Sequence, residues 1–535
     1  MFDKLKPKRT ETQSPAVQLS ADNWTDEQKH AIARCSGQAL SELEHILRDD
    51  SWPRAWWTRM LNYLQLKQED LAAQPMTLEH AKSMLSSDKR DVRIEVLVDF
   101  LAVSLDLDEA AKEKQEKTNM TYDARARRFF FVLAHVLELT PMEVTAVERS
   151  VAQQMYFALQ ESREGDKDPN LEDRAQLMQA SSQKAMEASN KKKTTMRWIA
   201  TGAGVIGGGA LIALTGGLAA PMLAPLLAGI TGATFFATAG GVALVTSVFG
   251  LTGGGLAGWK MHRRNRGLQE LGFQQILNDA DLPPIPTLQC TVCVSGFILD
   301  DKSETMTPWE QSFARSKNYN DIFCMQYETD ALMDLGAAFQ KFVRNQALRY
   351  AGVEVAKQTA LKAFFAAVAL PATLMKLADV LDNPWQIAAD RSRKAGEVLA
   401  DILEERVQGN RPCSLVGYSC GCLVIWSCLK ELYARGHKDL IDHVVLMGAP
   451  VSCGDEATQE WQDCLSVVSG RCINCYTDED WVLAFVYRMH SMDSDVAGLK
   501  PVKNVPRVEN IRLELEGHTS YRDAVPGIMD QIGFA

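Results

Sequence analysis

The spacing of hydrophobic residues divides the chain into two halves with different secondary structure. Residues 1–20 are polar, and we expect them to be disordered. From 21 to 194, apolar side chains recur every three or four positions, as Leu40, Leu43 and Leu47 do, which predicts amphipathic helices. This half contains no recognisable catalytic constellation. We therefore interpret it as a helical accessory domain.

After residue 263 the pattern changes to short apolar runs separated by helical stretches. Such alternation predicts an α/β fold over 263–535, with a parallel sheet and helices on both faces. The strand-like runs are 288–294, 322–327, 415–418, 443–447, 472–476 and 510–515, and the helical stretches include 331–345, 385–407 and 421–433.

One more apolar segment lies inside this half, at 363–375. It is too short to span a bilayer, because a spanning helix needs about 20 residues. A buried helix is the default interpretation. A lid over the active site and a surface that dips into lipid are the alternatives.

Between the two halves lies a run of 62 residues, 198–259, that contains no charge and includes 16 glycines. The run is too long for one membrane span and fits two, with Pro221 and Pro225 at the turn between them. We expect a transmembrane hairpin over 195–262. A re-entrant hairpin and a buried Gly- and Ala-rich core segment are the alternatives.

Basic residues flank the uncharged run on both sides. Lys191 to Lys193 and Arg197 precede it, and Arg263, Arg264 and Arg266 follow it. Cytosolic flanks of membrane spans are enriched in Lys and Arg. Both ends of the hairpin, and hence both soluble domains, are therefore expected in the cytosol, on an integral membrane protein whose organelle the sequence does not specify.

Charge and cysteine content exclude several other classes of protein. The net charge of −11 argues against a nucleic-acid partner. The N-terminal segment lacks the apolar core of a secretory signal, so the 12 cysteines are expected to be reduced thiols in the core. Two Cys-x-x-Cys pairs, at 290–293 and 472–475, lack further ligands at zinc spacing. No metal site is expected.

The most informative chemical motif is Gly-x-Ser-x-Gly at 417–421. It follows a strand-like run directly and opens into an apolar helix. This context predicts a nucleophile elbow, in which a sharp turn exposes Ser419 at the carboxyl end of the sheet. The helix that follows favours developing negative charge at its N-terminus. The plainer interpretation is a glycine-rich turn with an inert serine.

A nucleophilic serine needs a base, which in this fold follows the nucleophile and the acid. Four histidines follow Ser419. His437 and His443 precede any plausible acid, and His490 precedes the last strand, whereas His518 follows that strand. We therefore predict His518 as the base.

The acid should follow the fifth strand, where Asp478, Glu479 and Asp480 lie within three positions. Its role is to hold the base in the correct tautomer and to stabilise its charged form. Position in the sequence leaves Asp478 and Asp480 as the two alternatives.

The oxyanion formed during ester cleavage needs two aimed N–H donors. The backbone of Cys420, directly after the nucleophile, is one candidate. The other is expected from the loop at 295–297, where Gly296 permits close approach and Phe297 supplies the N–H. The alternative for this loop is an ordinary turn.

Over roughly 120–535 the chain resembles the eukaryotic family of transmembrane and coiled-coil domain-containing protein 4, whose members are predicted α/β-hydrolases. The segments that carry the resemblance are 122–125, the glycine-rich run, 382–385, 417–421, 444–450, 480–488, 496–499 and 517–518. The resemblance implies Ser419 as nucleophile and His518 as base. It also favours Asp480 over Asp478. Cys420 departs from the family, which usually has Leu there, but only its backbone N–H is required.

Two functional hypotheses follow. The first is a membrane-anchored serine hydrolase, a lipase or esterase that cleaves lipid acyl esters with the Ser419, Asp480 and His518 triad and needs no metal or organic cofactor. The second is a membrane-trafficking or scaffold protein with a vestigial hydrolase fold, which the large helical half would favour.

Overall fold

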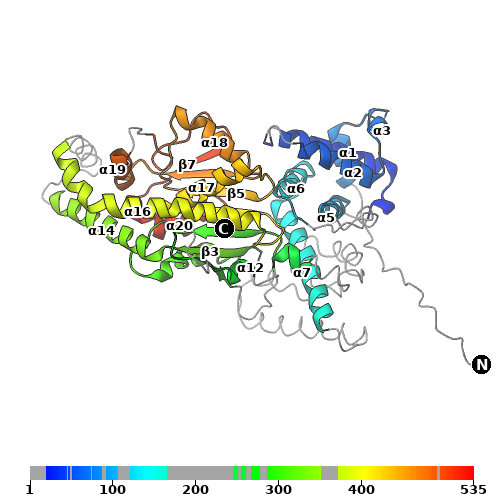
Figure 1. Ribbon diagram of the computed structural model, residues 1–535. Helices are drawn as coiled ribbons and strands as arrows, with labels where there is room; N and C mark the ends of the chain where they lie inside the picture. The colour runs from blue at the N-terminus through cyan, green and yellow to red at the C-terminus, as the bar shows by residue number, and fades with distance from the viewer. Residues whose placement is uncertain are drawn as a thin grey trace, which may run out of the picture.

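The computed structural model describes residues 20–44, 46–47, 51–73, 75–86, 92–105, 121–164, 245–250, 255–260, 267–277, 286–317, 319–350, 371–490 and 495–534 (Figure 1). Residues 1–19 of the predicted disordered segment and most of the predicted hairpin lie outside these residues, as does most of the apolar segment at 363–375. Ser20, the last residue of the predicted disordered segment, is instead buried at the start of the 3₁₀ helix η1 (Ser20–Asn23). Within them the chain forms an N-terminal helical part and a C-terminal α/β part, each with its own hydrophobic core.

The N-terminal part is helical, as the periodicity predicted. Its helices are α1 (Asp26–Glu44), α2 (Trp52–Leu64), α3 (Gln68–Ala73), α4 (Leu78–Ser86), α5 (Val92–Ser104), α6 (Ala124–Val136) and α7 (Pro141–Glu164). Asp123 precedes helix α6, and its side chain caps the helix by accepting from the Arg125 N–H at 2.7 Å.

Aromatic rings fill the centre of this helical core. Trp56 meets Phe100, Phe129 and Phe130 edge-on, with ring centroids 5.8 to 6.5 Å apart. All four side chains are buried, and edge-to-face pairs add to the free energy gained from burial alone. The helical part is therefore a packed domain core and not a set of loosely associated helices.

The C-terminal part is built on one seven-stranded sheet. Its strands are β1 (Leu271–Ile276), β2 (Cys290–Val294), β3 (Asp321–Tyr327), β4 (Cys413–Tyr418), β5 (Ile441–Met447), β6 (Cys472–Tyr476) and β7 (Val508–Arg512). Every predicted strand overlaps an observed one. The structure adds β1, which pairs antiparallel with β3 at one edge, whereas all other neighbours are parallel. The predicted α/β class is thus confirmed, with one antiparallel edge strand.

The strand order places the candidate site. The order is β1-β3-β2-β4-β5-β6-β7, so the chain runs outward in one direction from β2 and in the other direction from β4. Val294, the last residue of β2, pairs in register with Gly417 near the end of β4. Because this is the point where the order reverses, the loops that follow β2 and β4 meet there, and ligands of open α/β sheets bind at such points.

Helices connect and flank the strands. They are α12 (Gly255–Gly258), α13 (Thr307–Ser312), α14 (Thr329–Tyr350), α16 (Pro371–Glu404), α17 (Cys420–Arg435), α18 (Thr458–Leu465), α19 (Trp481–His490) and α20 (Tyr521–Gln531). Helix α17 packs on β2 and β4, and α16 packs on α17. Figure 1 shows α14 and α16 running side by side away from the N-terminal helices.

The structure describes only the C-terminal end of the uncharged run, at 245–250 and 255–259. Val245, Val248 and Phe249 are buried in the helical core, and Leu256 is buried in the core of the α/β part. This end of the predicted hairpin therefore packs against protein. None of the helices in the described ranges combines the length and apolar character that a bilayer crossing requires.

A buried ion cluster joins the two parts. Arg127 of α6 donates to Glu148 of α7, with 2.8 Å between Nε and Oε1, and also pairs with Asp442 of β5. All three side chains are at most 5 % exposed. Two backbone bonds support the junction: Tyr122 donates to the Asn410 carbonyl, and Ala124 to the Asp439 carbonyl.

Candidate active site

Ser419 lies on the sharp turn between β4 and α17. Its backbone has φ 54° and ψ −125°, a conformation that costs a non-glycine residue about 1–3 kcal/mol and is kept only when the surroundings impose it. The Ser419 N–H donates to the Met447 carbonyl of β5 at 2.9 Å. The predicted strand–turn–helix geometry is present, but the predicted exposure of Ser419 is wrong: the loop after β2 and the neighbouring aromatic rings bury it completely.

Three glycines allow the backbone to pack tightly around this turn. A Cβ on Gly421 would lie 2.1 Å from the Val294 carbonyl oxygen, and one on Gly417 would lie 2.9 Å from Ile425 Cδ1. On Gly296 a Cβ would lie 2.0 Å from the Tyr418 carbonyl oxygen. The end of β2 is thereby pressed against the elbow.

His518 lies beside Ser419, in the short 3₁₀ helix η8 (His518–Ser520) that precedes α20. The distance from Ser419 Oγ to His518 Nε2 is 2.6 Å, and from His518 Nδ1 to Asp480 Oδ2 it is 2.5 Å. Because a carboxylate only accepts, Nδ1 carries the proton and Nε2 accepts from the serine hydroxyl. The three residues form one continuous hydrogen-bonded chain.

The structure separates the two alternative acids. Asp480 is fully buried and caps α19, with Oδ1 accepting from the Leu483 N–H at 2.9 Å. Asp478 lies at the surface, where it pairs with Arg512 at 2.8 Å. The backbone places Asp480, and not Asp478, against His518.

The other three histidines lie in different surroundings. His437 pairs with Glu404 at the surface, and His443 accepts from the Arg471 N–H at 2.8 Å. His490 ends α19. Ser419 Oγ is hydrogen-bonded to His518.

One candidate oxyanion donor, Cys420, lies at the elbow, and the loop that contains the other packs against it. Cys420 is the first residue of α17, so its N–H has no acceptor within the helix. A Cβ on Gly296 would lie 2.4 Å from the Cys420 nitrogen, which brings the loop that contains Phe297 directly against this donor. The role of the Cys420 and Phe297 N–H groups as an oxyanion hole stays a prediction.

The Cys420 side chain does not compete with the serine. Burial raises the pKa of the Cys420 thiol to about 12, so it stays protonated near neutral pH and supplies no thiolate. All 12 cysteines are free and buried, as expected for core thiols. In the described part of the chain, no three His, Cys, Asp or Glu side chains gather into a metal site.

Aromatic rings cover the hydrogen-bonded chain. The ring of Phe339, on α14, meets the His518 ring edge-on with 5.1 Å between centroids, and Phe297 lies 5.7 Å away. Ser419 is 0 % exposed and His518 is 1 % exposed. The site is thus a buried environment lined by aromatic rings, in which hydrogen bonds to a developing charge are strong.

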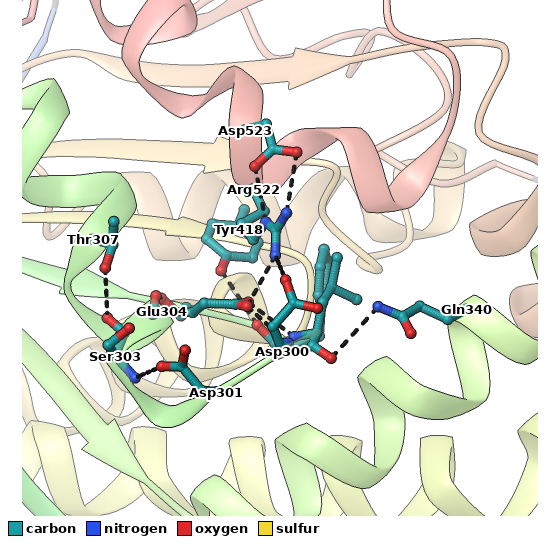
Figure 2. A network of polar contacts seen from close by, with 12 residues as sticks. Asp300, Asp301, Ser303, Glu304, Thr307, Gln340, Tyr418, Arg522 and Asp523 are labelled. Atoms are coloured by element: carbon teal, nitrogen blue, oxygen red, sulfur yellow. Dashed lines mark hydrogen bonds and ion pairs between the residues drawn. The ribbon is translucent and has the colours of Figure 1, made fainter.

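Two residues that sequence analysis did not single out also contact this region. Glu304 and Arg522 form a polar network with Asp300 on the loop after β2 (Figure 2). Their sequence context gave no signal, because isolated charged residues are usually solvated.

Comparison with known proteins identifies the family of the chain. The family described as "Protein of unknown function (DUF726)" matches residues 192–535. The chain belongs to the DUF726 family. The matched residues include the whole sheet and all three members of the hydrogen-bonded chain.

Curated relatives of this DUF726 protein extend the match into the helical part. It is 32 % identical over 445 residues to the transmembrane and coiled-coil domain-containing protein STS1 of rice, covering 79 % of this chain and 63 % of that protein. An uncharacterised membrane protein of Caenorhabditis elegans is 32 % identical over 421 residues, covering 77 % of this chain and 64 % of that protein. These matches confirm the family resemblance that the sequence motifs indicated.

A third relative bears a functional name. The probable lipase MIL1 of Saccharomyces cerevisiae is 31 % identical over 425 residues, covering 78 % of this chain and 37 % of that protein. The chain thus spans less than two thirds of the length of each of these three relatives. No solved structure matches it.

Proposed function

We propose that this protein is a serine hydrolase of carboxylic esters, with Ser419 as nucleophile, His518 as general base and Asp480 as the acid that orients it. The observation that carries the proposal is the buried chain from Ser419 Oγ to His518 Nε2 and from His518 Nδ1 to Asp480 Oδ2. These contacts occur at a strained strand–turn–helix elbow, as an α/β-hydrolase requires.

The proposed reaction uses only groups of this chain and water. Ser419 Oγ bonds to the ester carbonyl carbon while its proton passes to His518 Nε2. The Cys420 and Phe297 N–H groups donate to the oxyanion. The carbon–oxygen bond to the alcohol then breaks, and the alcohol leaves with the proton from His518. Water, activated by His518, cleaves the acyl-enzyme, releases the acid and restores Ser419.

A lipid ester is the proposed substrate class. Support comes from the apolar rings around the site, among them Phe297 and Phe339, and from the relative named a probable lipase. The membrane is the proposed source of substrate, since several relatives are named membrane proteins and 198–259 lacks charge.

Active-site labelling tests the proposal. A fluorophosphonate probe should label the wild-type protein and should fail to label Ser419→Ala. Asp478→Asn is a matched control, because Asp478 lies two residues from the proposed acid and is exposed. Labelling that persists in Ser419→Ala would refute the assigned nucleophile. Absence of both labelling and esterase turnover in the wild type would favour the scaffold alternative.

The substrate class has its own test. Turnover of a long-chain ester should rise when the ester passes from monomer to micelle, and chelators should leave turnover unchanged because a Ser–His pair needs no metal. Equal activity on short soluble esters, with or without an interface, would argue against a lipase.

The proposed membrane topology is tested separately from the chemistry. On intact membranes, an added protease should cut both the helical part and the α/β part, because both are proposed to face the cytosol. Deleting 198–244 should release the protein from membranes. Protection of one part and cleavage of the other would refute the hairpin.

A further inference from the structure

The side chain of Glu304 lies across the backbone of the loop that follows β2. Glu304 belongs to the 3₁₀ helix η6 (Lys302–Thr305). Its Oε2 accepts from the Leu299 N–H and its Oε1 from the Asp300 N–H, each at 2.8 Å. The side chain is only 9 % exposed. Bonds from backbone N–H groups to a nearly buried carboxylate are among the strong ones, so they fix this part of the loop.

The remaining backbone of the loop is also held. The Tyr418 hydroxyl donates to the Phe297 carbonyl at 3.3 Å, and the Ile298 N–H donates to the Leu332 carbonyl at 3.1 Å. From the Phe297 carbonyl to the Asp300 N–H, every N–H group is therefore bonded. The Phe297 N–H, the proposed oxyanion donor, belongs to the peptide group immediately before this series.

Arg522 connects the loop to the element that carries the base. Its Nη1 lies 2.9 Å from Glu304 Oε1 and 2.8 Å from Asp300 Oδ2 (Figure 2). Arg522 is in α20, four residues after His518 and in the helical stretch that η8 and α20 form together. Hydrogen bonds to Asp523 and Asp300 raise the pKa of Arg522 above its usual value, so it stays charged.

We propose that Glu304 and Arg522 are positioning residues for the oxyanion hole. Glu304 fixes the backbone that presents the Phe297 N–H, and Arg522 keeps that backbone in register with the helix that follows His518. The inference rests on the proposed hydrolase function. Neither residue touches the substrate. Both act by holding the donor and the base at a constant separation.

The expected effect is on chemistry more than on substrate binding. An oxyanion donor stabilises charge that exists only in the transition state, so its misplacement lowers kcat and leaves KM nearly unchanged. Complete loss of one donor costs about 100- to 1,000-fold in kcat. A donor that is present but loosely held should cost less, roughly 10- to 100-fold.

The experiment compares Glu304→Gln and Arg522→Met with Arg512→Met in the full-length protein. Arg512 is a matched control, because it also pairs with a carboxylate in this part of the chain but is exposed and contacts no loop N–H. The measurements are kcat and KM on a short p-nitrophenyl ester, the rate of fluorophosphonate labelling and hydrogen exchange over 295–305.

Both test variants should lose about 10- to 100-fold in kcat and in labelling rate, with KM within about threefold of wild type. Exchange at 297–301 should rise in both, and Arg512→Met should match wild type throughout. The double variant should lose little more than the worse single variant, because the two residues act in series.

Three results would overturn the inference. They are an unchanged kcat in Arg522→Met, a loss confined to KM, and a fall in thermal midpoint with kcat preserved below that midpoint. If the wild type still shows Ser419-dependent labelling, any of these results refutes the positioning role and leaves the proposed hydrolase function standing. A wild type without such labelling refutes the hydrolase function and the inference with it.

Discussion

His518 Nδ1 lies 2.5 Å from Asp480 Oδ2, and both side chains are fully buried. A buried carboxylate in this position leaves the imidazole one stable tautomer, with the proton on Nδ1 and Nε2 free to accept. Asp480 is itself fixed, because its other oxygen accepts from the Leu483 N–H. The orientation of the His518 ring is thus set by the start of α19.

The first prediction is that the three residues act as one unit. Ser419→Ala and His518→Ala should each lower kcat by about 10⁴- to 10⁶-fold, and Asp480→Asn by about 10⁴-fold. Double variants should lose little beyond the worst single one. Steady-state kinetics on a soluble ester measure this, and circular dichroism checks that each variant folds.

Asp478→Asn serves as the control for the acid. Asp478 is 58 % exposed, so its neutralisation should change kcat by less than about twofold. Additive losses across the triad, or a damaging Asp478→Asn beside a mild Asp480→Asn, would contradict the assignment.

The second prediction concerns the close approach of Gly296 to the elbow. In Gly296→Ala the new methyl group would lie 2.4 Å from the Cys420 nitrogen, so it should block the proposed oxyanion donor and abolish turnover. Gly527→Ala is the control, because a Cβ there meets nothing within 4 Å. In α20 that change should stabilise the protein by about 0.5–1 kcal/mol. Retained turnover in Gly296→Ala would place the oxyanion hole elsewhere.

The third prediction concerns the junction between the two parts. Arg127→Met leaves Glu148 and Asp442 buried without their counter-charge, which should destabilise the protein by about 3–5 kcal/mol. Thermal or urea unfolding measures the loss. Arg435→Met, which removes a more exposed arginine that pairs with three carboxylates, should cost under about 1 kcal/mol.

A compensating variant tests the cause of that loss. If uncompensated charge is responsible, adding Glu148→Gln and Asp442→Asn to Arg127→Met should recover much of the stability. No recovery would show that packing of the guanidinium, and not its charge, holds the junction.

The fourth prediction concerns pH. Burial lowers the pKa of His443 to about 4, assisted by the nearby Arg127, Arg128 and Arg471 and opposed by Asp442. The geometry agrees with a lowered pKa, since His443 Nδ1 already accepts from the Arg471 N–H and its lone pair is not available to bind a proton. The unfolded chain, with a His pKa of about 6.5, therefore binds a proton before the folded chain does. Stability is lost as the pH falls from about 6.5 to 4.

His443→Asn keeps an acceptor for the Arg471 N–H and removes the titration. Between pH 7 and pH 5 the wild type should lose roughly 2 kcal/mol more of its unfolding free energy than this variant. Urea midpoints at the two pH values measure the difference. Parallel losses in both proteins would assign the acid sensitivity to other groups.

The parallel strands could be predicted because they are buried on both faces and read as continuous apolar runs, as 288–294 does for β2. Strand β1 was missed. It is an edge strand of six residues in which Gln274 and Gln275 interrupt the alternation. Strand β1 is stabilised by pairing with β3, a partner about 50 residues away in sequence. The local pattern of hydrophobic residues does not reveal such a distant pairing.

The residues of the candidate site also divide into those that the sequence indicates and those that it does not. Ser419 and His518 follow from chain order and from the elbow motif. Asp480 had a local signal, since an acidic residue just before an apolar helix is a typical N-cap, and that would have distinguished it from Asp478 without the structure. Glu304 and Arg522 had none. They are 218 residues apart and meet only because α20 returns to the loop after β2.

Residues from both sides of the stretch 165–244 pack in one hydrophobic core. Val151 and Met155 of α7 are buried in the helical core, and so are Val245 and Val248, which follow that stretch. A single bilayer crossing between them would place two halves of one core in different compartments. Core packing alone thus predicts that any crossing is matched by a return, and replacing the basic flanks with acidic residues should not separate the two halves across a membrane.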